Sequence, residues 1–369
     1  MQLVKTKRDT LLRPLQIVSG IVERRHTLPI LANILIRKDG EKVSFLSTDM
    51  EVQITTHAEV GAGSENVGTT VAARKLLDIL RALPEDGEVT VTLENKRMTV
   101  KSGKSRFALQ TLAAEEFPTM VLADQYDTTV TLPQKTLKHL FNMVHFSMAQ
   151  QDIRYYLNGL LLVVEGKNVI AVATDGHRLA FCQVETDQEF PKRQEVIIPR
   201  KTIIELQRLL EDNDQPVELA IANNQVKLVF ADIELVSKLV EGKFPDYTRV
   251  VPKGYKNDFT ISRDQLLRSL QRAAIMTSDK FKGVRWVIAP GSLKISSTNA
   301  DQEEAVEELE IDYGGDSVDI GFNVTYLLDV LNNLKGDNVK IALGDANSSA
   351  LITIPDNEDF KYVVMPMRI

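Results

Sequence analysis

The sequence has little cysteine and lacks long apolar runs. Cys182 is the only cysteine among 369 residues, so no disulfide can form within one chain. No segment reaches the roughly 18 consecutive apolar residues that a bilayer span needs. The segment from Met1 to Thr10 also lacks the apolar core of a secretory signal. These absences favour a cytoplasmic chain over a membrane-spanning or secreted one, because a lone thiol stays reduced there.

Metal-binding and catalytic motifs are scarce as well. The five histidines form no His-x-x-x-His pair and no set with cysteine, so we expect no metal and no cofactor. Ser102-Gly103-Lys104-Ser105 resembles the end of a phosphate-binding loop, but that motif needs glycine where Met98 stands. Asp175 and His177 could suggest acid–base chemistry, but Asp175-Gly176 is typical of a hairpin turn. We therefore expect no catalytic residues and no enzymatic activity of this chain.

An internal repeat organises the sequence. The length predicts two or three domains, and 43% apolar with 26% charged residues is typical of globular chains. Leu11, Leu137 and Leu266 occupy matching places in three amphipathic segments and lie 126 and 129 residues apart. Phe117-Pro118 and Phe244-Pro245 recur 127 residues apart, where the first two repeats end. This period predicts three similar domains, over residues 1–125, 126–253 and 254–369.

Each repeat combines two helical patterns with several short strands. Apolar residues at helical spacing predict helices over 10–25, 72–82, 133–149, 199–210, 261–276 and 322–334. Three of these helices lead into predicted apolar strands at 28–31, near 160 and at 286–288. Alternation with period two predicts further strands, for example over 88–93 and 225–230. Because the strands come in hairpin runs, the expected fold class is α+β, with two helices plus antiparallel strands in each repeat.

The charge of the sequence is sorted by element. The net charge of −7 taken alone argues against nucleic-acid binding, yet the six predicted helices carry 14 basic and 5 acidic residues. If these helices line one surface, that surface attracts a polyanion. The alternative is that solvated helix faces carry such charges by chance.

Residues 96–106 and 301–310 have opposite charge. The first segment has five basic residues and no acid, and the second has six acids and no base. Complementary strand edges in the first and third repeats favour a head-to-tail contact between chains, which can close into a ring. Two solvated edges are an equal alternative. The contact would use Arg97, Lys104, Arg106, Phe107, Leu109, Ile275, Met276, Glu303, Glu304, Glu307 and Glu308.

Seven segments of the sequence resemble those of one known family. They are Thr27–Leu31, Ser102–Phe107, Gln151–Gly159, Thr174–Leu179, Lys243–Tyr247, Ile320–Val324 and Tyr362–Arg368. In this order they are similar to the bacterial sliding clamps, the beta subunits of DNA polymerase III. The resemblance spans the whole chain and implies a head-to-tail homodimer, a ring that encircles double-stranded DNA without sequence preference. Such a processivity factor for DNA replication needs only weak phosphate contacts, because tight ones would stop it from sliding.

The resemblance also implies the positions of functional residues. It adds Lys75 to the dimer interface. It implies DNA-facing residues at Arg25, Arg74, Gln151, Tyr155, Tyr156, Arg200 and Lys201. It implies a pocket for partner peptides with walls at Leu157, Thr174, Gly176, His177, Arg178, Leu179, Pro245, Arg249, Val250, Asn323, Tyr326, Val363, Met365, Pro366, Met367 and Arg368.

The pocket would receive short, partly apolar peptides of several partners. The resemblance implies the replicative polymerase alpha subunit, the clamp loader, translesion polymerases, and mismatch-repair and ligase proteins, with a cytoplasmic, nucleoid-associated location. Arg178, Arg249 and Arg368 can hold polar or carboxylate groups at the rim of such a pocket. The alternative function is a protein-binding scaffold that uses the same pocket without closing a ring, as the net charge of −7 and the acidic sixth helix suggest.

Overall fold

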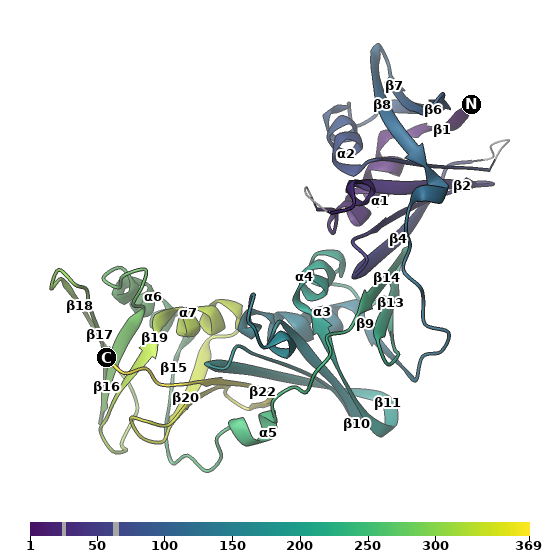
Figure 1. Ribbon diagram of the computed structural model, residues 1–369. Helices are drawn as coiled ribbons and strands as arrows, with labels where there is room; N and C mark the ends of the chain where they lie inside the picture. The colour runs from purple at the N-terminus through teal and green to yellow at the C-terminus, as the bar shows by residue number, and fades with distance from the viewer. Residues whose placement is uncertain (24–26, 62–65) are drawn as a thin grey trace. The chain divides into compact units, whose positions relative to one another are not determined.

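The computed structural model describes residues 1–23, 27–61 and 66–369 (Figure 1). The chain divides into two compact units. The first comprises Met1–Lys135 and Arg208–Leu239, and the second comprises Thr136–Gln207 and Val240–Ile369. Within the described ranges, no helix has both the length and the apolar character that crossing a bilayer requires.

A twelve-stranded antiparallel sheet forms the first unit. Its strands follow the order β1-β6-β7-β8-β5-β2-β3-β4-β14-β13-β12-β9. Their bounds are β1 (Gln2–Lys7), β2 (Asn33–Asp39), β3 (Lys42–Thr48), β4 (Val52–Glu59), β5 (Val67–Ala72), β6 (Glu88–Glu94), β7 (Arg97–Ser102), β8 (Ser105–Ala113), β9 (Thr128–Pro133), β12 (Pro216–Ile221), β13 (Gln225–Phe230) and β14 (Ile233–Lys238).

Helices α1 (Arg8–Ser19) and α2 (Ala73–Ala82) lie side by side in the first unit (Figure 1). Leu76, Leu77 and Leu80 of α2 are buried, whereas Arg74 and Lys75 are exposed. The helix therefore turns an apolar stripe to the core and keeps its cations in solvent.

Two antiparallel sheets form the second unit. Their strand orders are β10-β11-β22-β21-β20-β15 and β18-β17-β16-β19. The bounds are β10 (Gly159–Thr174), β11 (Arg178–Pro199), β15 (Asn257–Ser262), β16 (Gly283–Ala289), β17 (Ser292–Thr298), β18 (Glu304–Glu310), β19 (Val318–Asn323), β20 (Asn338–Leu343), β21 (Ala350–Ile354) and β22 (Asn357–Val364). The helices are α3 (Gln134–Asn142), α4 (Arg200–Leu209), α5 (Tyr247–Val250), α6 (Arg263–Ala274) and α7 (Val324–Asn333). The first residues of α3 and the last of α4 belong to the first unit.

The sequence repeat is visible in one recurring turn. Asp49 Oδ1 accepts hydrogen bonds from the amides two and three residues further on, at 2.9 and 2.8 Å. Asp175 Oδ1 does the same at 2.9 and 3.1 Å. Asn299 Oδ1 accepts from the amides two and four residues further on, at 3.0 and 2.9 Å. The same side-chain-capped turn thus joins β3 to β4, β10 to β11 and β17 to β18.

The predicted α+β class is confirmed, and some predicted element bounds are wrong. Residues 28–31 were expected to form a strand, but Pro29–Ala32 form a single 3₁₀ turn and β2 begins at Asn33. Proline at the first position favours such a turn, because it has no amide hydrogen to give to a sheet. The helix predicted over 133–149 ends at Asn142, whose carbonyl is bonded by His145 Nδ1 at 3.1 Å.

The helix predicted over 10–25 is also too long. It begins at Arg8 and ends at Ser19. The last predicted residues, 24–26, lie outside the described residues.

Candidate functional site

A small apolar cavity of about 190 Å³ lies in the second unit. Its walls come from the 3₁₀ turn Tyr155–Leu157, the turn between β10 and β11, the segment around α5 and the end of β22. Leu179 and Val363 also belong to the buried core of this unit, so the floor of the cavity is fixed by packing. The lining residues are Arg154, Tyr156, Leu157, Thr174, Gly176, His177, Arg178, Leu179, Pro245, Val250, Val363 and Met365.

The turn between β10 and β11 shapes one side of the cavity. The Thr174 hydroxyl donates to the Arg178 carbonyl at 2.6 Å and accepts from the Gly176 amide at 3.1 Å. Gly176 has φ +90°, which L side chains rarely adopt, and a Cβ there would lie 2.9 Å from Nη1 of Arg154. The backbone conformation therefore favours glycine at this position, and a Cβ here would also displace the Arg154 guanidinium.

Arg154 forms a second side of the cavity and is fixed within its own loop. Its Nε and Nη2 donate to the two carboxylate oxygens of Asp152 at 3.0 and 2.8 Å, and Nη2 also donates to the Asp175 carbonyl at 3.2 Å. Hydrogen bonds from Arg154 lower the pKa of Asp152 to about 2. Arg154 was not among the expected lining residues, although it stands within the segment Gln151–Gly159.

Arg178 forms the charged wall of the cavity. Its Nε donates to Asp175 Oδ2 at 3.1 Å, and its Nη1 donates to Asp329 Oδ2 of α7 at 2.5 Å. Its guanidinium carbon lies 4.5 Å from the centre of the Tyr326 ring. Burial alone would lower the pKa of Arg178, but Tyr362 and the two carboxylates raise it above its ordinary value. Arg178 is thus a permanently charged and anchored side chain.

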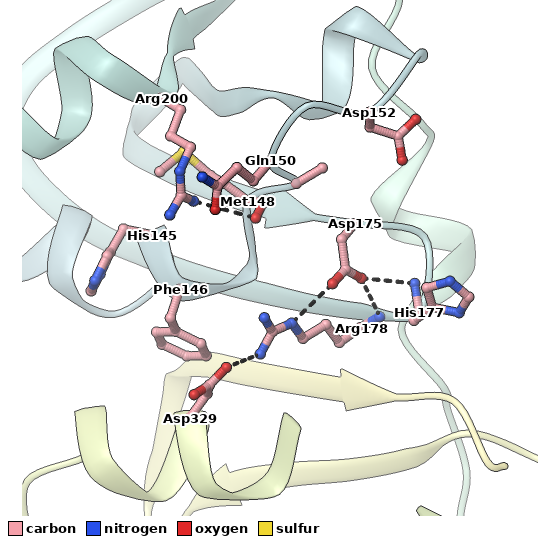
Figure 2. A pocket seen from close by; sticks show the side chains of 11 residues that line it. His145, Phe146, Met148, Gln150, Asp152, Asp175, His177, Arg178, Arg200 and Asp329 are labelled. Carbon is pink, nitrogen blue, oxygen red and sulfur yellow. Dashed lines mark hydrogen bonds and ion pairs between the residues drawn. The ribbon is translucent and has the colours of Figure 1, made fainter. Parts of the chain in front are cut away.

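A larger polar pocket of about 550 Å³ lies beside Arg178 (Figure 2). His177 and Arg178 line both this pocket and the apolar cavity. Arg200 points into the polar pocket, where its Nη1 donates to the Met148 carbonyl at 3.4 Å (Figure 2). Burial, and then the charge of Arg178, lower the pKa of Arg200. The polar pocket therefore carries a guanidinium whose charge is only weakly compensated.

The structure brings ten of the sixteen residues expected around a peptide pocket together at the apolar cavity. The remaining six are Arg249, Asn323, Tyr326, Pro366, Met367 and Arg368. Tyr326 stacks on His177 with ring centres 6.3 Å apart, and Asn323 caps α7 through the Thr325 amide at 2.9 Å. Met367 donates from its amide to the Gly321 carbonyl at 2.7 Å, which holds the terminal segment against β19.

The expected DNA-facing residues occupy different surroundings. Arg25 lies outside the described residues. Arg74, Gln151 and Tyr155 are exposed, Tyr155 to 75%, and Arg200 and Lys201 are half-buried near the start of α4. Tyr156 lines the apolar cavity and packs against the core of the second unit.

Six of the expected dimer-interface residues lie on two strands with a free edge, Arg106, Phe107 and Leu109 on β8 and Glu304, Glu307 and Glu308 on β18. Residues 105–110 of β8 pair only with β7, and β18 pairs only with β17, within the described part of the chain. Lys75, Arg97, Lys104, Arg106, Glu303, Glu304 and Glu308 are exposed, and Phe107, Leu109, Met276 and Glu307 are half-buried. Ile275 is 72% exposed at the end of α6, which is unusual for a large apolar side chain.

The one cysteine is unsuited to act as a nucleophile. Cys182 is buried in β11, and burial raises the pKa of its thiol to about 12. Among the described residues, no group of three His, Cys, Asp or Glu side chains could hold a metal ion.

Three similar α+β repeats joined through antiparallel strands, together with an apolar surface cavity, define a protein of the clamp class. The chain belongs to the DNA polymerase III beta subunit family. The family's N-terminal, central and C-terminal domain models match residues 1–121, 131–246 and 248–368. The expected family and its threefold repeat are thereby confirmed, and the chain is a clamp subunit and not a catalytic one.

Relatives match over nearly the whole chain. The beta sliding clamp of Pseudomonas putida is 45% identical over 363 residues, which cover 98% of this chain and 99% of that protein. The beta sliding clamp of Escherichia coli K12 is 46% identical over 365 residues, with the same coverage. The crystal structure of a sliding clamp from Pseudomonas aeruginosa bound to griselimycin has a TM-score of 0.96 and 43% identity, and covers 100% of both chains.

Proposed function

We propose that two copies of this chain form a head-to-tail ring around duplex DNA and tether the replicative polymerase and other replication and repair proteins by peptides bound in the apolar cavity. The single observation that carries the ring is the way in which successive repeats are joined. The domain bounds 1–125, 126–253 and 254–369, and the cytoplasmic, nucleoid-associated location, belong to the same proposal.

Both junctions within the chain use the same pair of strands. β4, the strand after the Asp49 turn, pairs with β14, the last strand of the second repeat. β11, the strand after the Asp175 turn, pairs with β22, the last strand of the third repeat. β18 is the strand after the corresponding Asn299 turn. Applied once more, this rule pairs β18 of one chain with β8 of another. These are the two strands with free edges, and a heterologous contact of this kind can close into a ring.

The first junction also suggests a register for the third. Gln53 of β4 lies opposite Val236, and Gln53 is the hairpin partner of Thr48. Glu304 occupies the corresponding position in β18, because it is the hairpin partner of Thr298. Val236 lies three residues after Ile233, the first paired residue of β14. Ala108 lies three residues after Ser105, the first paired residue of β8. We therefore expect Glu304 of one chain opposite Ala108 of the other.

This register brings opposite charges together. With Glu304 opposite Ala108, antiparallel pairing sets Val306 opposite Arg106. Arg106 then lies diagonally between Glu304 and Glu308, within reach of a long side chain. Such a contact stabilises a dimer by electrostatic attraction as well as by backbone hydrogen bonds.

DNA contact would come from cations on the helices and the nearby loops. Arg74 on α2 and Arg200 and Lys201 on α4 are each at least partly exposed, as is the loop with Gln151 and Tyr155. Side chains of this kind contact phosphates and carry no base recognition, which suits a ring that slides.

The apolar cavity supports the tethering role. It has room for one or two apolar side chains, and Met365 at its rim is a flexible residue that can adapt to different ligands. The ligand-bound relative from Pseudomonas aeruginosa supports ligand binding by this class of protein. Replicative polymerase alpha subunit, clamp loader, translesion polymerases, mismatch-repair and ligase proteins are the proposed partners.

Retention on DNA tests the ring. The clamp is assembled by a clamp loader on nicked circular duplex, and half of the sample is then cut once with a restriction enzyme. We expect the protein to co-elute with the circles on gel filtration and to be lost from the linear DNA within minutes. Equal retention on both DNAs would contradict encirclement and favour the scaffold alternative.

A further inference from the structure

We propose that Gly321 of β19 is a positioning residue: because it has no side chain, it lets the C-terminal segment (Met365–Ile369) lie against β19, and this contact holds the Met365 wall of the apolar cavity in place. The inference rests on the proposed function, because Met365 would contact the bound peptide. Gly321 itself lies in β19 and does not line the cavity. It can therefore act on a peptide only through the C-terminal segment.

Two backbone hydrogen bonds hold the C-terminal segment. The Met365 amide donates to the His177 carbonyl at 2.9 Å, and the Met367 amide donates to the Gly321 carbonyl at 2.7 Å. Pro366 between them has no amide hydrogen to donate. The segment thus runs from the turn between β10 and β11 to β19 in the four-stranded sheet, where the C-terminus is seen (Figure 1).

The C-terminal segment lies closer to Gly321 than a side chain would allow. A Cβ on Gly321 would have the Met367 carbonyl oxygen and Cγ1 and Cδ1 of Ile369 within 3.0 Å, a separation that real Cβ atoms essentially never show. The oxygen belongs to the backbone, so rotation of a side chain cannot relieve this contact. Gly321 is not among the residues with positive φ, so an alanine would be opposed only by these neighbours. It must push the segment away from β19.

The other two repeats show that this position in the fold does not itself demand glycine. The residues three places before the start of α2, α4 and α7 are Thr70, Ile197 and Gly321. Thr70 pairs with Leu112 of β8, the last strand of its repeat. The Ile197 carbonyl accepts from the Val240 amide, just past β14, at 2.9 Å. Both residues bury their side chains. In the third repeat the departing segment packs on the residue itself, and glycine leaves room for it.

The place of Met365 depends on this contact. Met365 is 49% exposed, so burial alone does not fix its side chain at the cavity. Its backbone is held by its own bond to His177 and by the bond of Met367 to Gly321, two residues further on. A segment released from β19 leaves the cavity with a mobile wall. Peptide binding must then overcome the cost of ordering that wall.

Gly321→Ala tests the positioning role in the full-length protein. The probe is a fluorescein-labelled, amidated heptapeptide of Leu, Phe and Ala, and its binding is measured by fluorescence anisotropy. We expect its affinity to fall at least about threefold, because ordering the released segment opposes binding. Hydrogen–deuterium exchange of the C-terminal peptic fragment should be faster by about fivefold, the size of one backbone hydrogen bond.

Gly314→Ala is the matched control. A Cβ on Gly314 would meet no neighbouring part of the chain within 4 Å, and Gly314 also lacks a positive φ. This variant makes the same chemical change in the same repeat. It should leave both the peptide affinity and the exchange of the C-terminal fragment unchanged.

Truncation distinguishes positioning from a general effect on folding. In a chain that lacks Met365–Ile369, the atoms that a Cβ on Gly321 would meet are gone. We therefore expect Gly321→Ala not to lower the melting temperature of the truncated chain. An equal fall in the truncated and the full-length chain would overturn the positioning role, because the alanine would then act within β19 itself.

Affinity and exchange together separate the inference from the function on which it rests. Unaltered exchange in Gly321→Ala would overturn the contact with the C-terminal segment, and faster exchange with full peptide affinity would overturn its link to the cavity. If the wild-type protein binds no heptapeptide while Gly321→Ala still speeds the exchange, Gly321 does hold the segment. The role of the cavity in peptide binding then fails alone.

Discussion

Arg272 of α6 holds Glu307 of β18 through two hydrogen bonds, 2.8 Å from Nε to Oε1 and 2.6 Å from Nη2 to Oε2. These bonds lower the pKa of Glu307 below its ordinary value. Glu307 is therefore satisfied within its own chain. Glu304 and Glu308 form no ion pair with any described residue, so both acids are available to a partner strand.

The cations of the opposite edge provide the first prediction. Reversing Arg97 and Arg106 together, as Arg97→Glu and Arg106→Glu, would bring a like charge at position 106 against Glu304 and Glu308 across the proposed contact and a second one on β7, the strand behind β8. We expect monomers at micromolar concentration in sedimentation-velocity runs at low salt. The wild-type dimer should itself loosen as salt rises, because screening weakens exposed ion pairs.

A second double variant controls for net charge. Lys167→Glu and Lys192→Glu change the charge by the same amount on the exposed β10–β11 hairpin, outside the proposed interface. This variant should stay dimeric. A dimer that survives in the Arg97 and Arg106 variant would refute the edge pairing.

Local patterns made the repeat, the fold class and most elements predictable from sequence. α2 and α4 lie within one residue of the predicted 72–82 and 199–210, because their apolar spacing is regular. The pairing of Arg178 with Asp329 was not predictable, because 151 residues separate them and only the tertiary fold brings them together. The ion pair between Arg272 and Glu307 was likewise not predictable, because Arg272 reaches β18 from α6, 35 residues earlier in the chain.

The C-terminal segment provides the second prediction. Met365 lines the cavity, and its amide donates to the His177 carbonyl at 2.9 Å. Deleting Met365–Ile369 removes this wall, so we expect at least about a tenfold loss of affinity for apolar peptides by fluorescence anisotropy, of the order of one buried apolar side chain. The dimer should be unaffected, because the deleted segment is not part of β18 or β8.

A point variant separates loss of the wall from loss of folding. Met365→Glu places a charge at the cavity rim and should weaken peptide binding while the melting temperature stays close to that of the wild type. Val121→Glu is the matched control, because Val121 is 86% exposed and does not line the cavity. Full peptide affinity in both Met365 variants would remove the assignment of this cavity to partner peptides.

Cys182 provides the last prediction, which concerns its thiol at different pH values. Burial raises the pKa of the thiol to about 12, whereas an unfolded cysteine ionises near pH 8.5. Because the thiolate is the reactive form, we expect the folded protein to react with a thiol reagent at pH 8 at least about 100-fold more slowly than the protein in denaturant. The unfolded state also releases this proton first, so the thiol should lower the stability of the folded state progressively above about pH 8.5. Cys182→Ala should lose this part of the pH dependence in urea melts at pH 7 and pH 10. Rapid labelling of the folded wild-type chain, at the rate seen in denaturant, would contradict the buried environment.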